Sequence, residues 1–340
     1  MVSMKNVADA CGVSVATVSK ALNDHSDIGQ TTKDAVRQKA KELGYFANSS
    51  ARSLRTSKSY NIGILFEDEA RSGLTHDFFS SVINSFKVTV EKLGYDITFI
   101  NNRGTGKLPM SFLGHCKYRG FDGVMIVCMD MRDAEVRELA ESDLPIVAID
   151  YQFKDKLAVF SNNNDGVHKL ATYAYEQGHR KIAYIHGAAS HVTEKRVDSF
   201  FEFVKEKGLE QDIPEEYIRI ADYRNVDAAA KETEALLDLP NPPTCILYPD
   251  DFSTIGGINV FKARNMRIPE DISIAGYDGI QIASVLEPKL TTIKQDTVGM
   301  GKAAAINLIN YIENPEGNQV MTEVLDVTLV EGKSLGKLGK

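Results

Sequence analysis

The chain has 340 residues and a formal net charge of -8, a length that predicts two or three domains rather than one compact core. Its apolar runs stay well below the roughly 18 residues of a membrane span, and its four cysteines form no CxxC pair, which argues against a disulfide framework or a zinc site. The first residues are charged where a signal peptide is apolar, so we expect a cytoplasmic protein without a membrane partner.

The charge is distributed unevenly along the chain. Residues 1–60 hold nine lysines and arginines against five acids, whereas the other residues hold 30 against 42. A basic N-terminal head on an acidic body is expected when only the head contacts phosphate groups.

The first predicted elements are two short helices separated by a tight turn. Residues 4–23 read MKNVADACGVSVATVSKALN, with a turn at Gly12 and Ser14 as the cap of the second helix. A third helix is expected from about Thr31 to Leu43. This pattern is typical of a helix-turn-helix, whose second helix enters the DNA major groove. The alternative is a small helical hairpin that binds no DNA.

The second helix carries two kinds of candidate DNA contact. Short hydroxyl side chains suit phosphate contacts, and they belong to Ser14, Thr17 and Ser19. Val15 and Ala16 can offer apolar contacts to bases, for instance to a thymine methyl, and Lys20 can donate to guanine.

The segment after the third helix reads GYFANSSARSLR, from Gly44 to Arg55. It resembles the LacI/GalR (lac repressor) family of transcription regulators, whose members carry GYxPNxxARxL here. The resemblance implies a hinge helix that forms on operator DNA and contacts it through Asn48, Ala51, Arg52 and Leu54. In it, Leu54 would wedge into the minor groove, as apolar side chains do when they unstack a base step. The alternative for Leu54 is a contact to the body, and Ala47 departs from the family's proline.

The body alternates short apolar runs with helical stretches, which predicts parallel sheets covered on both faces. The predicted strands are Ile62–Phe66, Ile97–Ile100, Val124–Val127, Ile146–Ile149, Ile182–Ile185, Cys245–Tyr248 and Ile272–Ala275. Such sheets bind ligands at the carboxyl ends of their strands. No GxGxxG, P-loop, HExxH or GxSxG motif is present, so we expect neither an enzyme nor a cofactor or metal.

The resemblance continues through GHRKIAYIHG, DISIAGYDG and LTTIKQD, the last expected as a late crossover to the first lobe. It implies an α/β protein with a three-helix helix-turn-helix head and a two-lobed body like the type I periplasmic binding proteins. The expected domains are 1–46 for the head, 47–59 for the hinge helix and linker, and 60–340 for the body. The first lobe would span about 60–160 and 294–322, and the second about 161–293 and 323–340.

The resemblance also places an effector site between the lobes. Its residues would be Asp77, Phe79, Arg196, Tyr223, Asp251 and Asp278. A guanidinium beside acceptor-only carboxylates suits a polyhydroxylated ligand. The alternatives are an ion pair within the lobe for Arg196 and a helix cap for Asp278.

The resemblance therefore implies a homodimeric repressor that binds double-stranded operator DNA and responds to a small carbohydrate effector. One alternative is a regulator of the same fold controlled by a partner protein. Another is a sugar-binding transport protein, which would need a secretion signal and no basic head. A sugar-processing enzyme would need a catalytic base and nucleophile that the sequence does not display.

Overall fold

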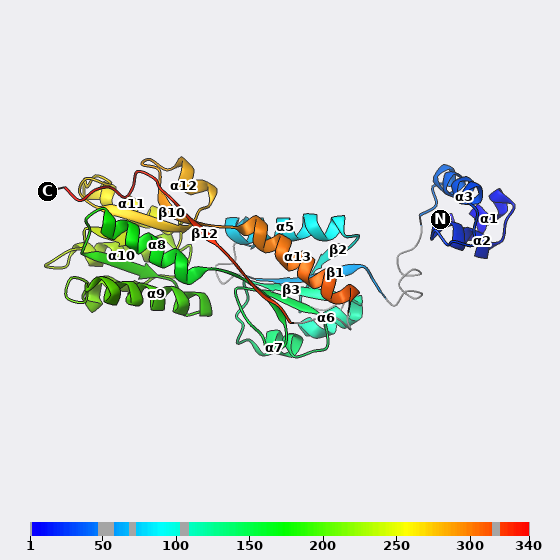
Figure 1. Cartoon of the computed structure of the whole chain (residues 1–340), viewed down its shortest axis with the longest axis horizontal. Helices are drawn as coiled ribbons and strands as arrows, with labels where there is room; N and C mark the ends of the chain where they lie inside the picture. The colour runs from blue at the N-terminus through cyan, green and yellow to red at the C-terminus, as the bar shows by residue number, and fades with distance from the viewer. Residues whose placement is uncertain (1, 47–57, 68–72, 103–108, 315–319, 340) are drawn as a thin grey trace. The chain divides into compact units, whose positions relative to one another are not determined.

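The computed structural model describes residues 2–46, 58–67, 73–102, 109–314 and 320–339. The chain divides into two compact units, Met1–Tyr60 and Asn61–Lys340, called here the head and the body (Figure 1). Among the described helices, none combines the length and the apolar character that crossing a membrane requires.

The head consists of three helices around a small apolar core. They are α1 (Met4–Cys11), α2 (Val15–Leu22) and α3 (Gln30–Leu43). Gly12 ends α1 with a φ of 64°, a left-handed conformation that allows the tight reversal into α2. The buried core residues come from all three helices: Val7, Ala8, Val18, Ala21, Val36 and Ala40. The predicted helix-turn-helix architecture is confirmed.

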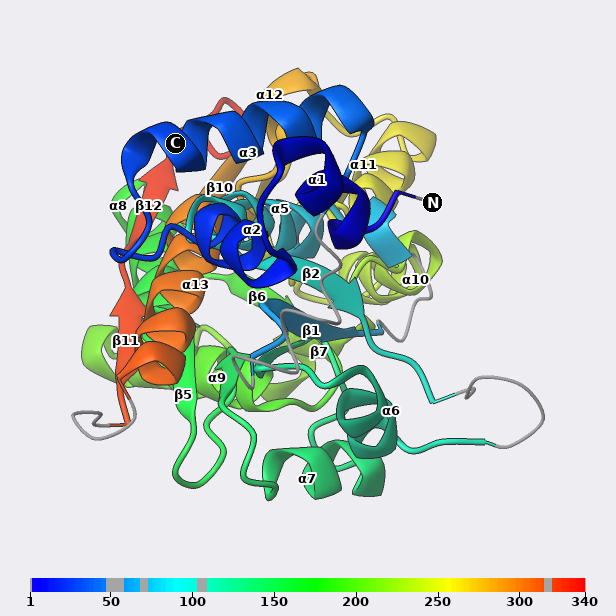
Figure 2. The same ribbon diagram turned by 90° about the vertical axis from the view of Figure 1, so that its right-hand side faces the viewer.

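The first lobe of the body is a parallel six-stranded sheet in the order β11-β5-β4-β3-β1-β2. Its strands are β1 (Asn61–Phe66), β2 (Asp96–Phe99), β3 (Gly123–Val127), β4 (Ile146–Ile149), β5 (Leu157–Ser161) and β11 (Thr322–Leu325). Its helices are η1 (Gly73–Thr75), α5 (Asp77–Lys92), α6 (Phe112–Arg119), α7 (Ala134–Ala140) and α13 (Thr297–Glu313). Figures 1 and 2 show α5 and α13 on one face of this sheet and α6 and α7 on the other.

The second lobe is another six-stranded sheet, in the order β12-β10-β9-β8-β6-β7, with β12 antiparallel to β10. Its strands are β6 (Ile182–His186), β7 (Ile218–Ile220), β8 (Cys245–Leu247), β9 (Ser273–Asp278), β10 (Thr291–Gln295) and β12 (Val327–Val330). Its helices are α8 (Asn163–Glu176), α9 (His191–Lys207), η2 (Glu215–Tyr217), α10 (Val226–Leu237), α11 (Thr254–Ala263) and α12 (Gln281–Val285).

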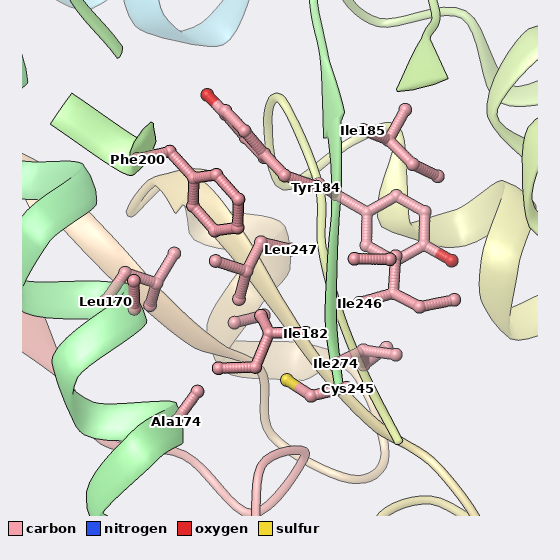
Figure 3. Packing of buried hydrophobic residues seen from close by; sticks show 14 of the residues in the cluster. Leu170, Ala174, Ile182, Tyr184, Ile185, Phe200, Cys245, Ile246, Leu247 and Ile274 are labelled. Carbon is pink, nitrogen blue, oxygen red and sulfur yellow. The ribbon is translucent and has the colours of Figure 1, made fainter. Parts of the chain in front are cut away.

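Apolar side chains cover both faces of the second sheet, as the continuous apolar strands predict. In Figure 3, Leu170 of α8 and Phe200 of α9 pack toward the face that carries Leu247. Ile185 and Ile246 point to the opposite face, because side chains alternate along a strand. The core of this lobe therefore lies on both sides of the sheet and holds the ends of its strands in place.

The chain passes between the lobes three times. The crossings follow β5, β10 and β11, and only Asp326 separates β11 from β12. The change of lobe expected at 322–323 lies instead at 326, because Thr322–Leu325 pairs with β5 of the first sheet. LTTIKQD is mainly strand β10 of the second sheet, so the crossover expected there begins at Asp296.

Helices α5 and α13 pack closely at Gly301. A Cβ atom at this position would lie 2.3 Å from the carbonyl oxygen of Val82 and 2.7 Å from the backbone nitrogen of Phe86. Both atoms belong to the backbone of α5, which cannot move aside as a flexible side chain can. Helix α13, which follows the second crossing, is therefore in close contact with α5 of the first lobe.

We predict that Gly301→Ala destabilises the body by about 1–3 kcal/mol, because the added methyl group forces the two helices apart. The measurement is urea unfolding followed by circular dichroism. In a helix without such contacts, replacing glycine by alanine would stabilise the protein by about 1 kcal/mol. An increase in the stability of Gly301→Ala would therefore contradict the close packing of α5 and α13. Lys302→Ala, on the exposed side of the same helix, is the matched control and should change little.

Candidate functional site

The first turn of α2 presents an exposed apolar surface. Val15 is 43% exposed and Ala16 is also exposed, whereas Val18 and Ala21 on the other face are fully buried. Ser14 caps the helix by accepting a hydrogen bond from the backbone nitrogen of Thr17 at 3.0 Å. Because Val18 and Ala21 are buried in the core of the head, Val15 and Ala16 on the other face of α2 point outward.

Lys20 does not extend freely from this surface. Its amine forms an ion pair with Asp27 in the loop before α3, and this contact lowers the pKa of the Asp27 carboxyl. Both side chains are about half exposed, so the pair is easily exchanged for another partner. Ser19 and Thr17 are half-buried on the flanks of the same helix. The predicted hinge contacts Asn48, Ala51, Arg52 and Leu54 lie outside the described residues.

A cavity of about 710 Å³ lies between the two lobes of the body. Its walls come from the start of α5, from the segments after β3, β4, β6, β7 and β8, and from the ends of β9 and β10. Apart from the start of α5, these are carboxyl ends of strands in the two sheets, where ligands bind in open α/β folds. The volume is within the range of small-molecule sites. Four predicted effector residues line the cavity: Phe79, Arg196, Tyr223 and Asp278.

Arg196 forms part of the cavity wall although it is only 4% exposed. Its Nε donates to Oδ1 of Asn163 at 2.7 Å, and its Nη1 donates to the carbonyl oxygen of Pro249 at 3.1 Å. The guanidinium carbon lies 3.7 Å from the centre of the Tyr277 ring, a cation–π contact. These contacts fix the plane of the guanidinium and compensate for its burial.

Two half-buried carboxyl groups lie near Arg196. Oδ1 of Asp278 is 4.0 Å from its Nη2 and accepts a hydrogen bond from Nε2 of Gln295 at 2.7 Å. Burial raises the pKa of Asp278 to about 7, while the Arg196 charge opposes the shift. Burial likewise raises the pKa of Asp150 to about 6, although its side chain accepts from the backbone nitrogen of Ser161. Both groups therefore titrate near neutral pH.

Aromatic side chains form other parts of the cavity wall. The hydroxyl of Tyr223 lies 2.9 Å from that of Thr193, which fixes the ring beside Arg196. On the first lobe, Phe79 packs against His76, with ring centres 4.6 Å apart. Phe78 also lines the cavity but is only 4% exposed, so Phe79 is the more accessible of the two adjacent rings.

Asp77 and Asp251, the other two predicted effector residues, do not line the cavity. Asp77 is exposed at the start of α5 and accepts from Nη1 of Arg224 at 3.2 Å, which joins the two lobes. Asp251 is fully buried and accepts from Oγ1 of Thr292 at 2.5 Å and from the backbone nitrogen of Ile280 at 2.9 Å. It therefore connects strand β10 to the segment after β9 within the second lobe, while its neighbour Asp250 reaches the cavity.

The sequence prediction missed most polar residues of the cavity, among them Asp150, Gln295 and Arg224. Asp150 follows β4 directly and Gln295 ends β10, so the rule that ligands bind at carboxyl ends of strands would have found both. Arg224 follows β7, a three-residue strand that was not predicted, and has a φ of 58°. Among the described residues, no group of three or more histidine, cysteine and acidic side chains could hold a metal ion.

We predict that Asp278 makes the stability of the unliganded body depend on pH. Its folded pKa of about 7 is above the usual 3.8, so the folded state holds a proton that the unfolded chain releases. The body should therefore become more stable as the pH falls from about 8 to about 5.5. Asp278→Asn should raise stability at the higher pH and reduce the gain on acidification, as measured by urea unfolding. The control is Asp222→Asn, because Asp222 is an exposed residue of the same cavity, and this variant should keep the pH dependence of the wild-type stability. If Asp278→Asn also kept the wild-type pH dependence, the raised pKa of Asp278 would be contradicted.

Two family models match the chain. The model described as bacterial regulatory proteins, lacI family, matches residues 3–48, and that of a periplasmic binding protein-like domain matches residues 171–335. A probable HTH-type transcriptional repressor, ExuR of Bacillus subtilis (strain 168), is 28% identical over 320 residues, covering 93% of both chains.

Solved structures share the fold along nearly the whole chain. The lac repressor dimer bound to operator and the anti-inducer ONPF matches with a TM-score of 0.82 and 23% identity, covering 98% of this chain and 99% of that one. The complex of the transcriptional regulator CelR with cellobiose matches with a TM-score of 0.70 and 22% identity, covering 98% and 100%. With a helix-turn-helix head and a cavity between two α/β lobes, the chain is a member of the lacI family of bacterial regulatory proteins.

Proposed function

We propose that the protein is a homodimeric repressor of transcription in the cytoplasm. The head binds double-stranded operator DNA, and a small carbohydrate in the cavity of the body changes the operator affinity. The observation that carries this proposal is the combination, in one chain, of a folded helix-turn-helix head with a cavity walled by both lobes. The related repressor and the operator-bound and cellobiose-bound structures support it.

For the DNA contacts, we propose that α2 reads bases with Val15, Ala16 and Lys20, and phosphates with Ser14, Thr17 and Ser19. The outward position of Val15 and Ala16 supports this assignment. A dimer places two such helices on a near-palindromic operator. Asn48, Ala51, Arg52 and Leu54 would add minor-groove contacts from the hinge.

For the effector contacts, we propose Phe79, Arg196, Tyr223 and Asp278. A ligand between the lobes contacts both, so it favours one angle between them over another, and this difference is what an effector needs to shift an equilibrium. The Asp77–Arg224 ion pair already joins the two lobes in the absence of ligand. Because linkage is reciprocal, a ligand that weakens operator binding must itself bind the DNA complex less tightly.

The test of this function begins with an operator chosen by the full-length protein from random duplex DNA. Carbohydrates that raise the melting temperature of the protein are then added to the operator-binding assay. We expect the dissociation constant to change by roughly 5- to 150-fold, the usual range of allosteric coupling. A carbohydrate that stabilises the body but leaves operator affinity unchanged would contradict ligand control.

We further predict that Lys20→Ala changes the base preference at one operator position by about 1–3 kcal/mol, because one donor to a base edge is lost. The measurement compares binding to a set of single-base operator variants. A uniform loss across all of them would assign Lys20 to a phosphate instead. Lys41→Ala, an exposed lysine of α3, is the control and should leave the preference unchanged.

A further inference from the structure

Acidic groups outnumber basic groups in the wall of the cavity. Among the described residues that line it, six are aspartates and two are arginines. The arginines are Arg196 and Arg224, and the aspartates are Asp130, Asp150, Asp222, Asp227, Asp250 and Asp278. A cleft with an excess of one sign concentrates ligands of the opposite sign and repels those of the same sign.

The two guanidinium groups are already engaged by protein acceptors. Arg196 donates to Asn163 and to the carbonyl of Pro249, and its face lies on the ring of Tyr277. Arg224 donates to Asp77 at 3.2 Å, and its guanidinium carbon lies 4.6 Å from the centre of the Phe252 ring. Both arginines are therefore partly occupied before a ligand arrives, which makes the bidentate recognition of a carboxylate or phosphate less favourable.

The cavity also holds an acceptor without a donor. Oε1 of Gln295 is buried and has no hydrogen-bond partner in the structure, although the residue lines the cavity. Its orientation follows from chemistry, because Nε2 must face the carboxylate of Asp278, to which it donates at 2.7 Å. A buried acceptor that lacks a donor is costly, and a ligand hydroxyl would satisfy it.

Among the described residues that line the cavity from the first lobe, none is a lysine or an arginine. There Phe79, Met129, Met131, Ile149 and Tyr151 present aromatic, thioether and aliphatic surface. This side suits the C–H face of a sugar ring, whereas the carboxylates and Gln295 suit its hydroxyl groups.

We propose that the cavity selects an uncharged, hydroxyl-rich ligand and rejects anionic counterparts of the same shape, such as uronates and sugar phosphates. This inference rests on the proposed function and specifies its ligand. Hydroxyl groups donate to the aspartates and to Gln295 and accept from the remaining N–H groups of Arg196. A carboxylate or phosphate would instead meet acceptors of its own charge, and such contacts strongly disfavour a partner.

The test compares matched ligands on the full-length protein at low salt and about pH 8, where imidazole groups carry little charge. The sets are glucose with glucuronate and glucose 6-phosphate, galactose with galacturonate, and ribose with ribose 5-phosphate, together with neutral cellobiose. Thermal shift identifies binders, and calorimetry measures their affinity. We expect a neutral member to bind and its anionic counterparts to bind at least roughly 100-fold more weakly.

A variant then tests the physical cause. Asp278→Asn removes one negative charge while keeping a similar shape, so the ratio of neutral to anionic affinity should fall by roughly tenfold. Asp198→Asn is the matched control, because Asp198 lies on the exposed side of α9, the helix that carries Arg196, and does not line the cavity. It should leave both affinities unchanged, and an equal effect of the two variants would overturn the role of the cavity charge.

The two proposals fail in different ways. An anionic member that binds more tightly than its neutral counterpart would overturn the ligand class and leave ligand control standing. If no carbohydrate of either kind binds while operator affinity is intact, the carbohydrate-controlled function itself is contradicted, and the ligand class with it.

Discussion

The buried guanidinium of Arg196 fixes the positions of several segments around the cavity. A charge as deeply buried as that of Arg196 is tolerated only when its N–H groups find acceptors. The acceptors come from separate parts of the second lobe, Asn163 at the start of α8 and Pro249 after β8, and Tyr277 on β9 supplies the ring beneath it. Through these contacts, Arg196 on α9 fixes the positions of three segments relative to one another, and these segments determine the shape of the cavity.

The same contact reaches the connection between the lobes. Asn163 stands two residues after Ser161, the last residue of β5 in the first sheet. In the proposed function, a ligand that displaces Arg196 would act on the first crossing through this hydrogen bond of 2.7 Å. The Asp77–Arg224 pair also bridges the lobes directly, but its exposed carboxylate keeps the contribution of this pair to stability modest. The site thus combines a rigid set of contacts around Arg196 with a weak ion pair between the lobes, an arrangement that is consistent with the proposed change of the angle between the lobes.

Most of the sheet architecture could be predicted from apolar runs, because parallel strands buried on both faces read as continuous Val, Ile and Leu. All seven predicted strands are present, and five of the strands that the structure describes were missed. Three of these, β7, β11 and β12, are short edge strands that are partly exposed and carry polar residues. The other two, β5 and β10, are mostly buried strands inside their sheets. In the site, resemblance found Arg196 and Asp278 but not which of Asp250 and Asp251 reaches the cavity. The two adjacent side chains point in different directions, because backbone N–H groups distant in the sequence bind them, that of Arg224 to Asp250 and that of Ile280 to Asp251. The pairing of Lys20 with Asp27 was equally hidden, since it depends on how a loop folds back on α2.

The short connection between β11 and β12 limits how the two lobes of the body can move relative to each other. One residue, Asp326, connects a strand of the first sheet to a strand of the second, and consecutive Cα atoms are separated by about 3.8 Å. At this edge the two sheets cannot separate, whatever occupies the cavity. Any opening must therefore be a rotation with its axis near Asp326, in which displacement grows with distance from the axis. A shift of a fraction of an ångström in the ligand contacts near this axis becomes a larger one at the far ends of the lobes.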